Sequence, residues 1–280
     1  MASPPLISAV VPSLNQGAFI ADAVRSLLDQ RDPALEILVI DGGSQDETLS
    51  ELEPFRSRLH CLSSETDHGH ADAVRKGFAR ASGEFLCWLN ADDVLLPGAF
   101  AALRAELERN PDATFAHGER VFIDAAGRVT GFRTLPWRSR YTLTRWPWLH
   151  QETALFRRRD VEAVGGVDPS LAFAVDYDLF VRLLARGPAA WVGRPLGAFR
   201  VHPGSKTVRE FAAVGRPERD RIARRHGVAP RWFERPIGLG FSAWIRLASR
   251  WASSREVVPP RGTSIRVWSE LGGSEAAARL

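Results

Sequence analysis

Short apolar runs alternate with amphipathic helical stretches along the first 110 residues, and this alternation limits the fold more than any other feature. Residues 6–12, 36–44 and 59–64 read as strands, while residues 18–30 and 71–81 repeat apolar side chains at helical spacing. Successive parallel strands need crossover connections, which are usually helices. The pattern therefore predicts an α/β fold with a sheet covered by helices on both faces.

The second half of the chain continues this plan with less regularity. We expect a hairpin around residues 125–127, which makes the sheet mixed, and a helix that ends at Gly187. Ser44 and Glu47 have the spacing of a capping box for a helix through Leu52. We expect a main domain over residues 1–207 and a basic helical extension over residues 208–280.

Composition and charge exclude several classes of protein. Cys61 and Cys87 lie in separate apolar contexts, which disfavours a disulfide framework and a cysteine zinc site. The chain shows no signal peptide and no apolar run that could span a membrane, so we expect a cytoplasmic protein. Residues 203–280 carry 15 Lys and Arg against 7 Asp and Glu. Because 35 of the 37 basic residues are Arg, coding bias explains this excess as well as chemistry does, and we expect no nucleic-acid partner.

Polar residues follow each of the first four expected strands. These stretches begin at Pro12, Asp41, Glu65 and Asn90. The carboxyl ends of parallel strands meet at one edge of a sheet, where ligands bind. The adjacent Asp92 and Asp93 repel each other, so a cation is expected beside them, although Asp residues also favour the turn that precedes a helix at Pro97.

Three common ligand chemistries lack their motifs. No glycine-rich turn for a dinucleotide follows the first strand, and no phosphate-binding P-loop is present. A phosphatase of the haloacid dehalogenase type needs a nucleophilic Asp where this chain has Pro12 and Ser13.

Five motifs together resemble family-two glycosyltransferases of the GT-A fold. They are VVPSLNQGAFIADAVRSLLDQ, ILVIDGGSQDET, ETDHGHADAVRKGFARASGEFLCWLNADD, HQETALFRR and DYDLFVRLL, in order across residues 6–207. The resemblance implies transfer of a sugar from a nucleotide-diphosphate donor, with a UDP-sugar favoured, to an acceptor hydroxyl with inversion. It also implies a divalent metal, Mn or Mg, and a role in polysaccharide or glycoconjugate synthesis.

The resemblance assigns a role to residues of the donor side. Asp92 and His202 would bind the metal, whose charge neutralises the leaving diphosphate. Asn90 stands where the family commonly has the first Asp of an Asp-x-Asp motif, so we expect it to bind ribose or sugar rather than metal. The residues expected at the donor nucleotide are Pro12, Asn15, Asp41, Asp72, Asn90 and Ala91. Asp41 and Asn15 could equally be a turn former and a helix cap.

The acceptor side needs a base that takes the proton of the attacking hydroxyl. The family places it at the start of a helix, which here is Asp176, whereas Asp178 should pair with Arg182. The residues expected at the donor or acceptor sugar are Asp93, His150, Gln151, Trp137 and Trp148.

The extension and the reaction each leave alternatives open. Residues 241–252 form an amphipathic pattern that suits a membrane surface near a lipid-linked acceptor, the catalytic domain, or a second subunit in a homodimer. Asn90 favours an alternative in which the chain binds sugar nucleotides or glycans without catalysis. A nucleotidyltransferase is a weaker alternative, because such enzymes carry a glycine-rich basic loop after the first strand.

Overall fold

The computed structural model describes residues 7–32, 34–134, 139–145, 149–229, 262, 264 and 265. Within this part of the chain, one sheet of nine strands forms the centre of the molecule. The strands are β1 (Ile7–Ser13), β2 (Leu35–Asp41), β3 (Cys61–Ser64), β4 (Phe85–Trp88), β5 (Val94–Leu95), β6 (Phe115–Ile123), β7 (Val129–Arg133), β8 (Ala154–Arg157) and β9 (Ala189–Arg200).

The sheet is parallel in its first half and mixed in its second. The strand order is β3-β2-β1-β4-β8-β6-β9-β5, and β7 pairs with β6 outside this path. Strands β1 to β4 run parallel, whereas β8 is antiparallel to both of its neighbours. The expected hairpin around residues 125–127 is confirmed as the antiparallel pair of β6 and β7.

The central strands are apolar on both faces. In β1, Val10 belongs to one core cluster, while Ala9 and Val11 belong to the cluster on the opposite face. In β2, Leu38 and Ile37 are divided between the two clusters in the same way. A strand that is buried on both sides needs a continuous apolar run, which explains the unbroken apolar segments of the sequence.

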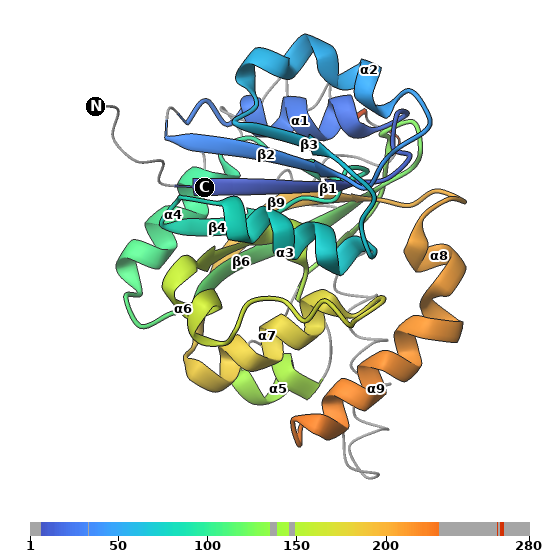
Figure 1. Cartoon of the computed structure of the whole chain (residues 1–280). Helices are drawn as coiled ribbons and strands as arrows, with labels where there is room; N and C mark the ends of the chain where they lie inside the picture. The colour runs from blue at the N-terminus through green and yellow to red at the C-terminus, as the bar shows by residue number, and fades with distance from the viewer. Residues whose placement is uncertain are drawn as a thin grey trace.

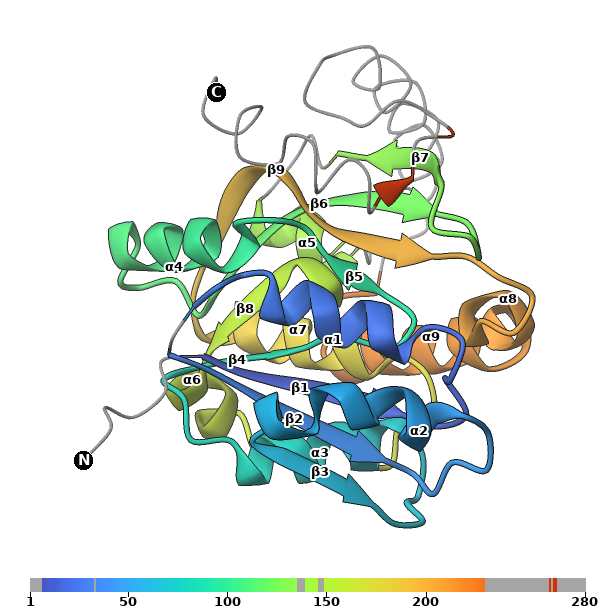
Figure 2. The ribbon, with the colours of Figure 1, turned by 90° about the horizontal axis from the view of Figure 1, so that it is seen from above.

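Helices cover both faces, as expected (Figures 1 and 2). The apolar side chains of α1, α2 and α4 pack on one face, and those of α3, α5, α6, α7 and α9 pack on the other. The helices are α1 (Ile20–Leu28), α2 (Thr48–Leu52), α3 (His70–Arg80), α4 (Ala99–Arg109), α5 (Arg140–Arg145), α6 (Arg158–Ala163), α7 (Val175–Arg186), α8 (Lys206–Glu210) and α9 (Arg216–Arg225).

The expected capping box is wrong. Helix α2 begins at Thr48, and Glu47 occupies its N-cap position without a side-chain hydrogen bond to the helix. The Ser44 hydroxyl instead donates to a carboxylate oxygen of Asp41, and it also accepts the backbone N–H of Asn15 at 2.8 Å. Ser44 therefore joins the loops after β1 and β2.

The C-terminal helices lie beside the edge to which β1 and β2 point (Figure 1). The expected boundary at residue 207 falls inside α8, and α9 packs Ile222 and Ala223 into the same core cluster as α7. Farther along, Ile265 is buried against Val129 of β7. The amphipathic stretch at residues 241–252 lies outside the described residues.

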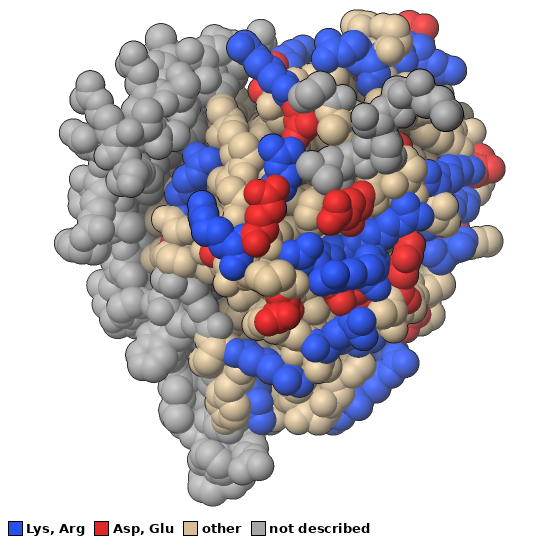
Figure 3. All heavy atoms as spheres, turned by 90° about the vertical axis from the view of Figure 1, so that its left-hand side faces the viewer, with Lys and Arg blue, Asp and Glu red and all other residues tan. Residues whose placement is uncertain are grey.

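Two surface properties bear on the expected partners. No helix in the described part of the chain has both the length and the apolar character needed to cross a bilayer. On the face shown in Figure 3, acidic and basic side chains are interspersed.

Candidate active site

A cavity of about 690 Å³ opens at the carboxyl edge of β1 and β4. Its wall brings together segments that are far apart in the sequence. Pro12 comes from β1, Asn90 to Asp92 follow β4, and His150 and Gln151 precede β8. Asp176 of α7 and Arg219 of α9 line it as well. The expectation that the strand ends share one cleft is therefore confirmed for β1, β4 and β3, whose following loop contributes Asp67, whereas the loop after β2 does not line the cavity.

Asp92 and His202 meet at the cavity although 109 residues separate them in the chain. One Asp92 carboxylate oxygen lies 3.2 Å from His202 Nε2, and the side chains are 19% and 11% exposed. His202 follows β9, where its ring lies 4.6 Å from that of Phe19 and its backbone N–H donates to Ser205 Oγ at 3.0 Å. The two residues predicted as metal ligands therefore lie in contact with each other.

Asn90 and Ala91 also line the cavity, as expected. Asn90 Oδ1 lies 3.0 Å from His70 Nε2, and its amide nitrogen donates to Asp93 at 3.2 Å. Burial lowers the pKa of His70, which keeps its ring neutral. Asn90 is thus oriented by hydrogen bonds to a neutral histidine and to the carboxyl group of Asp93.

Asp93 lies behind the cavity wall and is fully buried. It accepts hydrogen bonds from the Arg200 backbone N–H at 3.0 Å and from Gln151 Nε2 at 3.4 Å. Burial, followed by the nearby Asp92 and Glu152 charges, raises its pKa well above the usual range. The carboxyl group accepts hydrogen bonds from Asn90 and Gln151, and the expected contact of Asp93 with a sugar stays a prediction.

His150 and Gln151 line the cavity and are nearly fully buried. Burial, together with the charges of Arg120 and Arg133, lowers the pKa of His150 well below its usual value, so the imidazole is neutral. In the described structure His150 Nε2, Gln151 Oε1 and the indole N–H of Trp88 have no hydrogen-bond partner. Buried polar atoms without partners are rare in proteins, and three on one cavity wall indicate a polar ligand.

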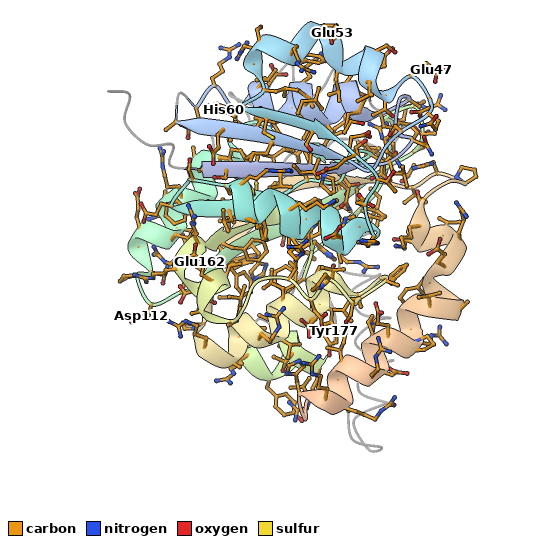
Figure 4. All side chains as sticks on the ribbon, in the orientation of Figure 1. Glu47, Glu53, His60, Asp112, Glu162 and Tyr177 are labelled. Carbon is orange, nitrogen blue, oxygen red and sulfur yellow. The ribbon has the colours of Figure 1, made fainter. Side chains whose placement is uncertain are left out.

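Asp176 lies in the first turn of α7 and faces the cavity. One of its carboxylate oxygens accepts the Tyr177 backbone N–H at 2.8 Å. Burial raises the pKa of Asp176, while that hydrogen bond and the charges of Arg120 and Arg219 partly oppose the rise. Figure 4 shows the neighbouring Tyr177 where α7 faces α9. Asp178 pairs with Arg182 at 2.6 Å, as expected.

Three residues expected at the nucleotide lie outside the cavity wall. Asp41 is fully buried, and its carboxylate accepts hydrogen bonds from Ser44, Ser64 and the Gly43 N–H, which leaves no free face for a base. Asn15 is exposed at a φ of 53° and accepts the Gln45 N–H at 2.9 Å. It is not the cap of α1, since Phe19 occupies that N-cap position, and its contact with a nucleotide stays a prediction.

Asp72 is likewise occupied. Its carboxylate is buried and pairs with Arg75 at 2.7 Å, and this pairing lowers its pKa to about 2. These contacts hold the first turns of α3 together, and the predicted contact of Asp72 with a nucleotide stays a prediction. The expected contacts at Trp137 and Trp148 lie outside the described residues.

The sequence missed several charged residues around the cavity. Arg120 of β6 lines it, and its guanidinium forms a two-point ion pair with the fully buried Glu152. Arg219 also lines it, yet no carboxylate of the described residues pairs with its guanidinium. No local motif marks these positions, because only the folded sheet and α9 bring them to the site.

The Asp92 carboxylate and the His202 imidazole could supply part of the ligands of a divalent cation. A carboxylate and an imidazole are both suitable ligands for Mn, and the oxygens of a diphosphate could supply the remaining positions. No group of three or more His, Cys, Asp or Glu side chains that could hold a metal occurs among the described residues. A metal bound here would therefore need the diphosphate oxygens of the nucleotide sugar as further ligands.

Comparison with known proteins agrees with this geometry. The model of the family described as glycosyl transferase family 2 matches residues 8–165, more than half of the chain. TuaG of Bacillus subtilis (strain 168), a protein named for teichuronic acid biosynthesis, is 37% identical over 92 residues. The match covers 32% of this chain and only 36% of that protein.

Two solved structures share the fold. S. aureus TarS 1–349 in complex with UDP-GlcNAc superposes with a TM-score of 0.60 at 18% identity, over 71% of this chain and 60% of that chain. The mannosyltransferase PcManGT from Pyrobaculum calidifontis, in complex with GDP-Man and Mn²⁺, gives a TM-score of 0.63 at 21% identity, over 99% and 79% of the two chains. The chain therefore belongs to glycosyltransferase family 2 and has the α/β fold of the GT-A type.

Proposed function

We propose that this glycosyltransferase transfers a sugar from a nucleotide-diphosphate donor to an acceptor hydroxyl with inversion, and that Asp176 is the general base. One observation carries the proposal: Asp92, which contacts His202, and the partly buried Asp176 line a single cavity. A site for the leaving diphosphate and a site for the attacking hydroxyl thus share one space. Pro12, Asn90 and Ala91 form its donor-nucleotide wall.

The donor is held at the end of the cavity where Asp92 and His202 lie. A divalent cation bound there, Mn or Mg, would neutralise the charge that develops on the leaving diphosphate. The Mn²⁺ bound by PcManGT supports this assignment. The solved relatives bind UDP-GlcNAc and GDP-Man, and we favour a UDP-sugar for this chain.

Asp176 acts on the acceptor. Its carboxylate accepts the proton of the acceptor hydroxyl while the hydroxyl oxygen attacks the anomeric carbon and the bond to the diphosphate breaks. A carboxylate with a raised pKa is a stronger base than an ordinary one, which suits this step. His150 Nε2 and Gln151 Oε1 are free to bind sugar hydroxyls.

Asp176→Asn tests the assignment of the base. The amide keeps the shape of the side chain and loses the proton acceptor, so sugar transfer should fall by about 10²–10⁴-fold while donor affinity stays within twofold. Release of nucleoside diphosphate from a panel of nucleotide sugars, with and without Mn²⁺, gives the rate, and calorimetry gives the affinity. Full activity in the variant would remove Asp176 from the mechanism.

The same panel decides between catalysis and binding alone. Asn90, which has no charge for a metal, favours the alternative of a protein that binds sugar nucleotides or glycans without turnover. Binding of a donor without nucleoside diphosphate release, even with candidate acceptors, would establish that alternative.

The remaining parts of the proposal concern partners. The acceptor is a glycan or a lipid-linked glycan, in line with the glycoconjugate named in the description of TuaG. We place the protein in the cytoplasm, where the basic residues 211–280 contact the inner face of the membrane or a second copy of the chain. Flotation with anionic vesicles and light scattering measure these two contacts.

A further inference from the structure

Residues 172–174 lead into α7, the helix that carries Asp176. They are held by Glu218, which lies outside the expected catalytic domain of residues 1–207. Glu218 of α9 accepts three backbone N–H groups in succession. Its carboxylate oxygens lie 3.0 Å from the nitrogen of Ala172, 2.7 Å from that of Phe173 and 2.7 Å from that of Ala174. Ala174 is the N-cap residue of α7, and Asp176 follows two residues later.

The hydrogen bond to the N-cap residue Ala174 satisfies an N–H group at the terminus of α7. The first N–H groups of a helix have no partner within the helix, and the positive end of its dipole favours a nearby anion. No side chain of the α7 N-cap itself makes a capping hydrogen bond. Glu218 is only 7% exposed, so its charge-assisted bonds are shielded from water. A carboxylate from another helix thus holds the N-cap residue of α7 and the two residues before it.

Further contacts from the same C-terminal helices hold this segment. The Lys206 ammonium group donates to the Ala172 carbonyl at 2.5 Å, and the rings of Phe173 and Phe211 lie 5.9 Å apart. A Cβ atom on Gly215 would lie 2.6 Å from the Phe173 ring, so the π-helical turn at Phe211–Gly215 packs directly on it. Phe173, Ala174 and Asp176 all line the cavity.

We propose that Glu218 is a positioning residue for Asp176. Through the backbone of residues 172–174, it fixes the first turn of α7 so that the Asp176 carboxylate faces the cavity in a largely dry setting. This inference rests on the proposed role of Asp176 as the base. Glu218 itself does not line the cavity and touches no reacting atom.

Three variants of α9 in the full chain separate positioning from simple loss of charge. Glu218→Ala removes all three acceptor contacts, whereas Glu218→Gln keeps one oxygen and therefore part of them. Asp220→Asn is the matched control, because Asp220 is an exposed acid on the same helix with no hydrogen bond to residues 172–174. A positioning role predicts the largest effect for Glu218→Ala, a smaller effect for Glu218→Gln and the smallest for Asp220→Asn.

The first measurement is hydrolysis of the donor over a range of pH. In Glu218→Ala we expect kcat to fall by about 10–100-fold while KM for the donor stays within twofold, because small displacements of a catalytic group have effects of this size. Water that reaches a loosened Asp176 should reduce its desolvation, so the acid limb of the profile should shift to lower pH. Asp220→Asn should match the wild type.

The second measurement needs no activity. Hydrogen exchange of residues 172–177 should be about tenfold faster in Glu218→Ala and less affected in Glu218→Gln, since lost hydrogen bonds no longer protect these amides. If the wild type turns over a donor but Glu218→Ala keeps its kcat and acid limb, the positioning role is overturned and the proposed function stands. If no donor is turned over, the proposed function fails, and unchanged exchange in Glu218→Ala would then overturn the positioning role as well.

Discussion

The charges around Asp176 set the pH range in which it can accept a proton. Burial raises its pKa, and the Arg120 and Arg219 charges oppose the rise. The two arginines differ, because Arg120 is already paired with Glu152 while Arg219 has no carboxylate partner among the described residues. A substitution of Arg219 therefore changes the electrostatic field at Asp176 without breaking a buried ion pair.

Arg219→Gln should shift the acid limb of the pH–rate profile to higher pH. The positive charge stabilises the ionised Asp176, so its removal raises the pKa of that carboxyl further, and a larger part of the enzyme is then protonated at any acidic pH. Donor hydrolysis across pH measures the shift. Arg224→Gln is the control, since Arg224 is an exposed arginine on the same helix. A limb that stays in place would show that Arg219 does not act on Asp176.

Individual site residues could be predicted where a motif carries them. Asp92, His202 and Asp176 were predicted in this way, and the structure places Asp92 and Asp176 on one cavity with His202 beside Asp92. Asp41 stays a prediction as a nucleotide contact, because its position at a strand end suits a ligand contact and a turn equally well, and its carboxylate is hydrogen-bonded within the protein. Glu152, Glu218 and Arg219 could not be found, since their relation to the site exists only after distant segments pack together.

At the scale of elements, helix α3 depends on a close approach to β1. A Cβ atom on Gly77 would lie 2.3 Å from a Val10 methyl carbon and 3.1 Å from the Val10 Cβ atom. Only a glycine allows this distance, and it brings α3 near enough for His70 at its start to reach Asn90. The helix thus connects core packing to the cavity wall.

Gly77→Ala should lower the free energy of unfolding by about 1–3 kcal/mol, because the added methyl group overpacks the interface by more than alanine's helix propensity returns. Urea denaturation followed by circular dichroism measures the change. Gly131→Ala in β7, where the nearest side-chain atom to a new Cβ lies at 3.7 Å, should stay within about 0.5 kcal/mol. Equal stability of both variants and the wild type would contradict this account of the α3 interface.

Most elements were predictable because each carries its own periodicity. The strands that are buried on both faces have continuous apolar runs, and α1 and α7 repeat apolar residues at helical spacing. The start of α2 was wrong for a physical reason. Ser44 has one hydroxyl group, and the fold uses it to hold Asp41 and Asn15 rather than to cap a helix.

At the scale of the whole molecule, residues 264 and 265 contact the β6–β7 hairpin of the sheet. Ile265 is buried with Ile123 and Val129, and its backbone N–H donates to the Gly127 carbonyl at 2.9 Å. Ser264 bridges to Arg128 in antiparallel fashion. The extension is therefore attached to the β6–β7 hairpin at one point, whatever other surface it contacts.

Ile265→Ala should destabilise the protein by about 2–4 kcal/mol, because it leaves a cavity in the small cluster under the hairpin. Thermal unfolding of the full chain measures this effect. Leu49→Ala, at a position that is 37% exposed, serves as the control and should change stability much less. An unchanged melting temperature for Ile265→Ala would mean that this segment does not stabilise the hairpin.

The contact between Glu218 and residues 172–174 also affects when the enzyme becomes competent during its synthesis. During translation the nine strands, Asp92, His202 and helix α7 are synthesised before Glu218, which holds the start of α7. A nascent chain that still lacks α9 should already bind a nucleotide yet release little product. The proposed activity would thus depend on the synthesis and packing of α9.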